Sequence, residues 1–145
     1  MKSTIFIFLL LVTMSCQNSE RKQIEQLVKE WTDREILLPE GPVFTRFATD
    51  TVSYTIQPAR YKVIVFVDSV GCISCKLQLP KWKDLINEVD SLSETDIPFL
   101  FFFQTKNVSE IRHILRCDNF ANPVCIDTAD DLYKLNRFPS NMMFQ

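Results

Sequence analysis

The strongest constraint on this chain is a pair of cysteines, Cys72 and Cys75, that follows an apolar, β-branched run at residues 61–67 after a short turn. The run has the length of a strand and is apolar on both faces, which is typical of a parallel strand covered by helices on both sides. Apolar residues at helical spacing begin at the second cysteine. A C-x-x-C pair between a strand and a helix is typical of a dithiol/disulfide redox site.

The position of the first cysteine indicates its chemistry. We expect Cys72 at the N-cap or in the first turn of the helix, where free backbone N–H groups and the helix dipole stabilise a thiolate. Cys75 lies nearly one turn later and is placed to attack a mixed disulfide formed on Cys72. The sequence therefore predicts Cys72 as the nucleophile and Cys75 as the resolving thiol. Zinc sites also use C-x-x-C pairs, so a structural zinc domain is an alternative.

Strand and helix patterns alternate along the rest of the chain. Further buried strands are predicted at residues 99–103 and 124–126, with helical patterns between and after them. This order predicts βαβ units, and therefore an α/β fold with a parallel sheet. Residues 43–56 alternate between apolar and polar side chains, which predicts a β-hairpin.

The helices are predicted from apolar stripes and capping signals. The helix after the cysteines carries one stripe made of Cys75, Leu79, Trp82, Ile86 and Val89, widened by Leu85 and Leu92. Pro80 is expected to kink this helix, because proline has no N–H and its ring opposes the preceding turn. A capping box at residues 107–110 is expected to begin the next helix, and Thr128 is expected to cap the last one.

The N-terminus has the features of a targeting segment. Its apolar run, Ile5 to Met14, is shorter than the roughly 20 residues that a membrane-spanning helix needs. Cys16 follows a small residue just after this run, which resembles a bacterial lipoprotein signal, although Thr13 stands where leucine is usual. The alternatives are an ordinary signal peptide and a helix that stays embedded; in either case the chain leaves the cytoplasm, where disulfides can persist. An amphipathic helix is predicted at residues 19–36, either docking on the domain or binding a partner.

The wider pattern around the cysteines resembles the active site of the thioredoxin family. That family has the pattern C-x-x-C-K-x-x-x-P behind a buried strand, and Cys72, Cys75, Lys76 and Pro80 match it. The resemblance covers roughly residues 60–139. It implies a three-layer α/β/α fold with a parallel central sheet, in which Lys76 and Pro80 support the two catalytic cysteines.

Together with the N-terminal signal, the chain resembles periplasmic thioredoxin-like lipoproteins. The resemblance implies a membrane-anchored protein that faces the periplasm of a bacterial cell envelope and is held by a lipid on Cys16. Its implied partners are protein or small-molecule thiols and disulfides, and no cofactor or metal is implied. The two residues between the cysteines lack the histidine of strong oxidants, which favours a reductase.

The chain departs from the family pattern at three places. Gly71 replaces the aromatic residue that usually precedes the first cysteine, and Phe66 occupies the place of the family's buried acid. Asp68 is either a substitute proton acceptor or a cap of the loop. Pro139 is the candidate for the family's cis-proline, but only six residues follow it, too few for the final β-hairpin and closing helix. We therefore expect a truncated family member in which strand 61–67 has an unpaired edge.

The predicted organisation has four parts. These are a lipoprotein-type signal peptide (1–16), an N-terminal amphipathic helix (17–36), a β-hairpin extension (37–60) and an incomplete thioredoxin-like domain (61–145).

Other candidate residues are given structural roles. Cys117 and Cys125 are expected to be buried free thiols, with a disulfide between them or a zinc site shared with the C-x-x-C pair as alternatives. His113, the one histidine, is expected on a helix surface, and Asp130 and Asp131 are expected in the acidic first turn of the last helix. The net charge is −2 and the charges are interspersed, so no surface for nucleic acid is predicted.

The leading functional hypothesis is therefore a thiol–disulfide oxidoreductase-like protein of the cell envelope. The alternative is a non-catalytic thioredoxin-like fragment or binding module in which the Cys72–Cys75 pair forms a static disulfide.

Overall fold

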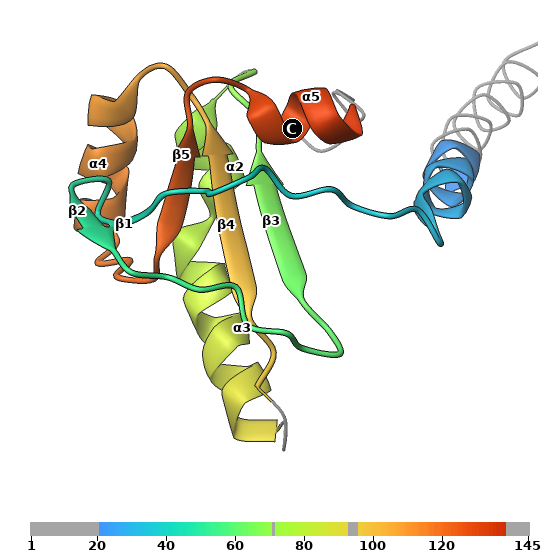
Figure 1. The fold of residues 1–145 in the computed structure, drawn as a ribbon, viewed down its shortest axis with the longest axis horizontal. Coiled ribbons are helices and arrows are strands. Elements are labelled where there is room, and N and C mark those ends of the chain that lie inside the picture. The colour runs from blue at the N-terminus through green and yellow to red at the C-terminus, as the bar shows by residue number, and fades with distance from the viewer. Residues whose placement is uncertain (1–20, 71, 93–95, 139–145) are drawn as a thin grey trace, which may run out of the picture. The chain divides into compact units, whose positions relative to one another are not determined.

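The computed structural model describes residues 21–70, 72–92 and 96–138, which form an α/β fold around a mixed sheet (Figure 1). The sheet has five strands in the order β2–β1–β5–β4–β3. The strands are β1 (Phe44–Arg46), β2 (Asp50–Val52), β3 (Val63–Val67), β4 (Phe99–Gln104) and β5 (Val124–Asp127). The labelled helices are α2 (Ile73–Leu77), α3 (Leu79–Leu92), α4 (Val108–Cys117) and α5 (Asp131–Asn136). The predicted α/β class is confirmed.

The three predicted buried strands form the parallel part of the sheet. Val65 of β3 lies beside Phe101 of β4, and Phe101 lies beside Val124 of β5. Helices connect these strands in the predicted βαβ order. The carboxyl ends of β3, β4 and β5 therefore meet at one edge of the sheet, which brings the turns that follow them together.

The predicted hairpin is confirmed, and it joins the main sheet. β1 and β2 pair antiparallel, with Thr45 opposite Thr51. β1 also pairs antiparallel with β5, where Phe44 lies opposite Cys125. The sheet is therefore mixed, whereas the strand patterns predicted a parallel one, because a pairing partner far along the chain leaves no mark on local periodicity.

Strand β3 lies at the end of the sheet. Within the described residues it pairs with β4 alone, so the expected unpaired edge is present (Figure 1). Its side chains alternate between two apolar environments, because successive residues of a strand point to opposite faces.

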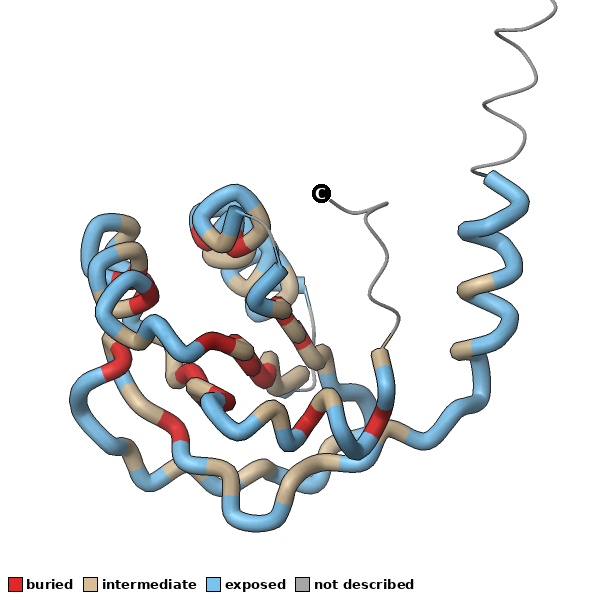
Figure 2. The backbone as a smooth tube through the Cα atoms, turned by 90° about the horizontal axis from the view of Figure 1, so that it is seen from above, coloured by how far each residue is buried: buried red, intermediate tan, exposed pale blue. Residues whose placement is uncertain are grey.

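Both faces of the sheet are packed with apolar side chains, and the buried positions concentrate along the strands (Figure 2). The face covered by α2, α3 and α4 buries Val65, Val67, Leu77, Leu79, Phe101, Phe103, Ile111, Leu115, Phe120 and Val124. The face covered by α5 and irregular chain buries Phe44, Leu100, Phe102, Cys125 and Leu132. Helices thus lie against both faces, and the predicted aromatic run of β4 is core as expected.

The helix after the cysteines is broken in two instead of kinked at Pro80. α2 ends at Leu77, and its C-cap residue Gln78 has left-handed backbone angles (φ 40°, ψ 41°). Pro80 is the second residue of α3, where a backbone N–H needs no partner within the helix. The prediction of one kinked helix was wrong. Proline is tolerated in the first turn of a helix as well as at a kink, so Pro80 is compatible with either arrangement.

The predicted stripe of this region is too wide. Leu79 is fully buried, and Trp82 packs edge-on against Phe101 with ring centroids 6.0 Å apart. Leu85 and Leu92, however, are 40% and 76% exposed. Leu85 and Leu92 therefore lie outside the stripe that packs against the sheet.

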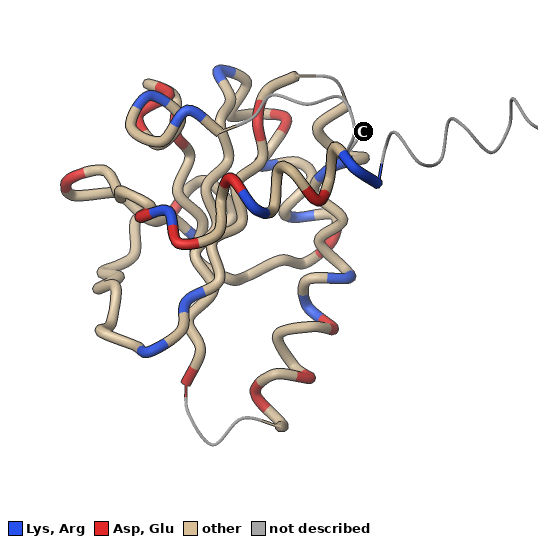
Figure 3. Tube along the Cα trace, turned by 90° about the vertical axis from the view of Figure 1, so that its right-hand side faces the viewer, with Lys and Arg blue, Asp and Glu red and all other residues tan. Residues whose placement is uncertain are grey.

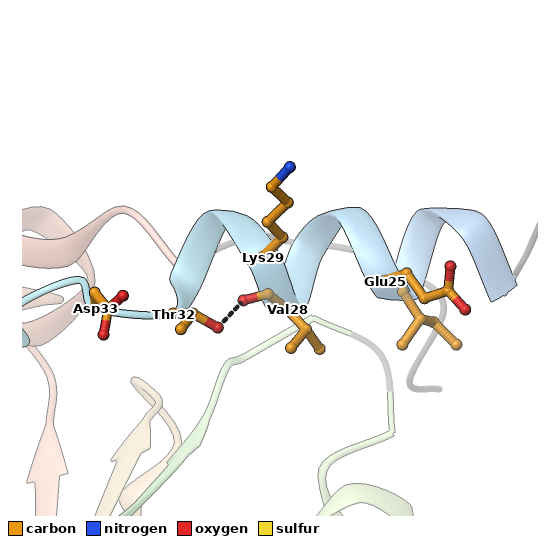
Figure 4. Close-up of a pocket in the computed structure, with 6 residues that line it drawn as sticks. Glu25, Val28, Lys29, Thr32 and Asp33 are labelled. Carbon is orange, nitrogen blue, oxygen red and sulfur yellow. Dashed lines mark hydrogen bonds between the residues drawn. The ribbon is translucent and has the colours of Figure 1, made fainter.

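The chain divides into two compact units between Ile36 and Leu37, and the N-terminal unit contains a helix at residues 21–31. This helix ends before the predicted limit at Ile36, because the Thr32 hydroxyl donates to the Val28 carbonyl (2.7 Å) and Asp33 has a positive φ of 64° (Figure 4). A shallow groove along it is lined by Ile24, Glu25, Val28, Lys29, Thr32 and Asp33. Within the described residues, no helix is long and apolar enough to span a membrane.

Candidate functional site

The turn between β3 and α2 is held by Asp68. Its Oδ1 atom accepts a hydrogen bond from the Val70 N–H (3.1 Å), which closes an Asx turn. The same atom accepts an ion-paired hydrogen bond from the Lys76 ammonium (2.7 Å). Both side chains are partly buried, at 24% exposed for Asp68 and 17% for Lys76. The loop-cap interpretation of Asp68 is confirmed, and Lys76 is its partner.

Cys72 is the N-cap of α2, as predicted. It has extended backbone angles (φ −78°, ψ 103°), and its sulfur accepts the N–H of Cys75 at 3.3 Å. The Ser74 hydroxyl lies 3.2 Å from the same sulfur. Cys72 and Cys75 are at disulfide-bonding distance, with their Cα atoms 5.4 Å apart, and both residues are exposed. The sulfur of a thiolate on Cys72 would therefore accept hydrogen bonds from the Cys75 N–H and the Ser74 hydroxyl at the N-terminus of α2.

A groove of about 540 Å³ opens beside Cys72. Its lining residues come from the turns after three parallel strands, and they are Ser69, Cys72, Ile73, Thr105, Lys106, Asn107, Glu110 and Asp130. Cys72 lines the groove and Cys75 does not. A molecule in the groove therefore meets Cys72 before Cys75.

The polar groups of the groove are ordered by hydrogen bonds among themselves. Asn107 caps α4 by accepting the Glu110 N–H at 3.3 Å, and its amide donates to the Glu110 carboxylate at 3.1 Å. The side chain of Gln104 donates to Asp130 at 2.8 Å. Lys106 adds a positive charge beside these carboxylates. The groove thus carries both signs, and Lys/Arg and Asp/Glu residues are similarly interspersed along the described chain (Figure 3).

Most of the residues that line the groove were not predicted as site residues from the sequence. Thr105 and Lys106 follow the second parallel strand without a recognisable motif. Asn107 and Glu110 were predicted as a helix cap, which is confirmed, but not as part of a site. The available signal was their position just after a parallel strand, where ligand sites of α/β proteins concentrate.

The predicted cap of the last helix was wrong. Asp127, at the end of β5, accepts the N–H groups of Asp131 and Leu132, both at 2.9 Å. Asp130 precedes the helix with a positive φ of 61° and makes no side-chain cap. Thr128 is therefore not the capping residue; a buried carboxylate one position earlier satisfies the helix N-terminus.

Cys117 and Cys125, the two described cysteines outside the C-x-x-C pair, are free thiols, so a disulfide between them is excluded. Cys125 is buried as predicted, and burial raises its pKa to about 11, with a smaller contribution from Asp127. Cys117 is exposed, contrary to the prediction, because it ends α4 on the outer side. His113 is also exposed on α4, with its Nε2 atom 3.5 Å from the Cys117 sulfur.

The remaining predicted residues do not line the groove, or they lie outside the described chain. Phe66 stacks on Phe138, with ring centroids 4.8 Å apart. Pro80 lies in the first turn of α3. Cys16 and Pro139 lie outside the described residues. In the described part of the chain, no group of three or more His, Cys, Asp or Glu side chains is placed to hold a metal ion.

No known protein family, curated protein or solved structure matches this chain. The chemistry of the site therefore has to be inferred from its geometry.

Proposed function

We propose that the chain is a thioredoxin-like thiol–disulfide oxidoreductase, with Cys72 as its nucleophile and Cys75 as its resolving thiol. One observation carries this proposal: the Cys72 sulfur caps α2, lies at bonding distance from Cys75 and lines an open groove. The helix N-terminus favours the thiolate, which is the form that attacks disulfides. The groove gives a substrate access to that sulfur.

The reaction conserves electrons through two exchanges. In the reductive direction, the Cys72 thiolate attacks a substrate disulfide, a mixed disulfide forms, and one substrate sulfur leaves as a thiolate. Cys75 then attacks the Cys72 sulfur, which releases the second substrate thiolate and forms the Cys72–Cys75 disulfide. Two electrons have passed to the substrate, and a dithiol reductant is needed to restore the reduced pair. The oxidative direction is the reverse of these steps.

We propose protein or small-molecule disulfides as the substrates. Most residues that line the groove are polar, and its size suits a small molecule or a few side chains of a protein. Lys106 and Glu110 on its wall can pair with groups of either charge. We favour the reductive direction. The equilibrium reduction potential of the Cys72–Cys75 pair determines which direction is preferred.

Trapping variants test the assignment of the two sulfurs. The full chain in mild detergent, carrying Cys75→Ser, should accumulate a mixed disulfide with a model disulfide peptide. Cys72→Ser should accumulate none, and Cys117→Ser serves as the matched control that leaves the wild-type behaviour unchanged. Mass spectrometry after acid quenching and alkylation of free thiols gives the readout.

The wild-type chain, equilibrated in dithiol/disulfide buffers of graded potential, should show reversible two-electron oxidation and reduction of the Cys72–Cys75 pair. Catalysed reduction of insulin disulfides would then establish activity. If the pair neither titrates reversibly nor traps a peptide, the static-disulfide alternative replaces this proposal.

The proposal includes a place in the bacterial cell envelope, with Cys16 lipidated and the domain facing the periplasm. The apolar run before Cys16 and the adjacent small residue support it. Labelling of cells with radioactive palmitate should mark the wild-type chain and not Cys16→Ala. Equal labelling of both chains would contradict a lipid on Cys16. The redox chemistry is tested separately, by the trapping and titration experiments.

A further inference from the structure

The edge of β3 that faces away from β4 pairs with no other strand among the described residues, and it presents a row of backbone hydrogen-bonding groups. The Val63 N–H donates to the Pro98 carbonyl at 3.0 Å, on the side of β4. Because backbone groups alternate in direction along a strand, those of Val65 also face β4. The N–H and C=O groups of Ile64 and Phe66 therefore face away from the sheet, toward the open edge.

The same edge is apolar on both faces. Val65 and Val67 are buried against the helices on one face, while Ile64 and Phe66 are half-buried on the other. Tyr61, just before the strand, is 59% exposed. Proteins usually protect an apolar edge strand of this kind, because it readily pairs with another strand.

We propose that β3 pairs antiparallel with β3 of a second copy of this chain, in a register centred on Val65. This register pairs the whole strand with itself, as a two-fold symmetric dimer requires. It places Ile64 opposite Phe66 of the second copy, and these are the residues whose backbone groups face the open edge. Each such pair exchanges two hydrogen bonds, and its β-branched and aromatic side chains share the same face of the sheet.

The charges at the two ends of the strand select this arrangement. Lys62 precedes β3 and Asp68 follows it. In the proposed register, Lys62 of each copy lies opposite Asp68 of the other copy, which gives two such pairs in the dimer. A parallel pairing in register would instead place Lys62 beside Lys62 and Asp68 beside Asp68, which is unfavourable. Both hydrogen bonds described for Asp68 end on Oδ1, so Oδ2 can accept from Lys62.

The dimer does not obstruct the proposed redox site. Cys72 follows the carboxyl end of β3, and antiparallel pairing places the two copies of that end at opposite ends of the shared strands. The interface and the redox chemistry are therefore tested by different measurements.

Amide hydrogen exchange resolved by residue tests the register directly. The full chain in mild detergent is measured across a hundredfold range of concentration. The amides of Ile64 and Phe66 should become protected as concentration rises, in step with dimer formation seen by analytical ultracentrifugation. The Val65 amide, which faces β4, should be protected at every concentration and serves as the internal control.

A charge variant adds a second measurement. Lys62→Glu places two like charges opposite each other and should weaken the dimer about tenfold, whereas Lys81→Glu on α3 should leave it unchanged. Protection of Ile64 and Phe66 that does not depend on concentration would mean that the chain covers its own edge, and would overturn the proposal. Absence of protection at all concentrations, or a dimer insensitive to Lys62→Glu, would overturn it as well.

Discussion

Lys76 donates an ion-paired hydrogen bond to Asp68 over 2.7 Å, and this contact joins the end of β3 to the helix that carries the two cysteines. The pair closes a loop that contains both Cys72 and Cys75. The contact therefore holds the turn that carries Cys72 in shape, and the Asp68 carboxylate neutralises the Lys76 ammonium.

Removing one partner of this pair should change Cys72 reactivity in opposite directions. Asp68→Asn leaves the Lys76 ammonium unpaired beside the reduced cysteines, which favours the thiolate and should speed alkylation at pH 7 about two- to threefold. Lys76→Met leaves the carboxylate unpaired and should slow it by a similar factor. Stopped-flow alkylation of the reduced chain gives the rates. Lys81→Met is the matched control, and equal slowing by both variants would instead indicate a purely structural role.

The left-handed residue between α2 and α3 is a site for stabilisation. Gln78 has a φ of 40°, a conformation that costs a residue with a side chain about 1–2 kcal/mol relative to glycine. Gln78→Gly should therefore raise the free energy of unfolding by about 0.5–1 kcal/mol after the entropy cost of glycine is included. Denaturant unfolding measures this difference. Gln78→Ala retains the strain and should give no gain.

Asp127 and Thr128 distinguish the observed cap of α5 from the predicted one. Asp127→Ala removes the acceptor of two backbone N–H groups, one of them buried, and should cost about 1–2 kcal/mol of unfolding free energy. Thr128→Ala should change it by less than about 0.5 kcal/mol. Chemical unfolding of the two variants provides the comparison, and equal losses would contradict the assignment.

Cys125 should make stability fall in alkali. Its folded-state pKa is raised to about 11 from an ordinary value of 9.0, so the unfolded chain loses this proton first as pH rises. The stabilisation is fully present below pH 9 and declines through pH 11, by on the order of 2 kcal/mol.

Unfolding measured from pH 8 to 11 on the reduced chain should show this decline. Cys125→Val, which keeps an apolar side chain of similar size, should flatten the curve, and Cys117→Ser should not. An equal slope in the Cys125→Val variant would assign the decline to another group, such as Tyr54, whose pKa is raised by burial and by Asp96.

Local patterns were sufficient for the elements that carry the cysteines. The apolar run before Cys72 became β3, and the predicted N-cap position of Cys72 is confirmed. The strands at β4 and β5 and the start of α4 at Asn107 were also predictable, because each depends on residues adjacent in sequence. Where local signals had two meanings, as at Pro80, the prediction failed.

The sequence by itself determined the strand, the helix and the spacing that place one sulfur at a helix N-terminus within reach of another. Only the tertiary structure decided what surrounds them. The groove beside Cys72 needs Lys106 and Asp130 from turns after two other strands, and the mixed sheet needs Phe44 beside Cys125. Propensity and periodicity act between neighbours in the chain, whereas these contacts follow from how the whole core packs. The chemistry of the cysteines is therefore local, and access to them is set by the fold.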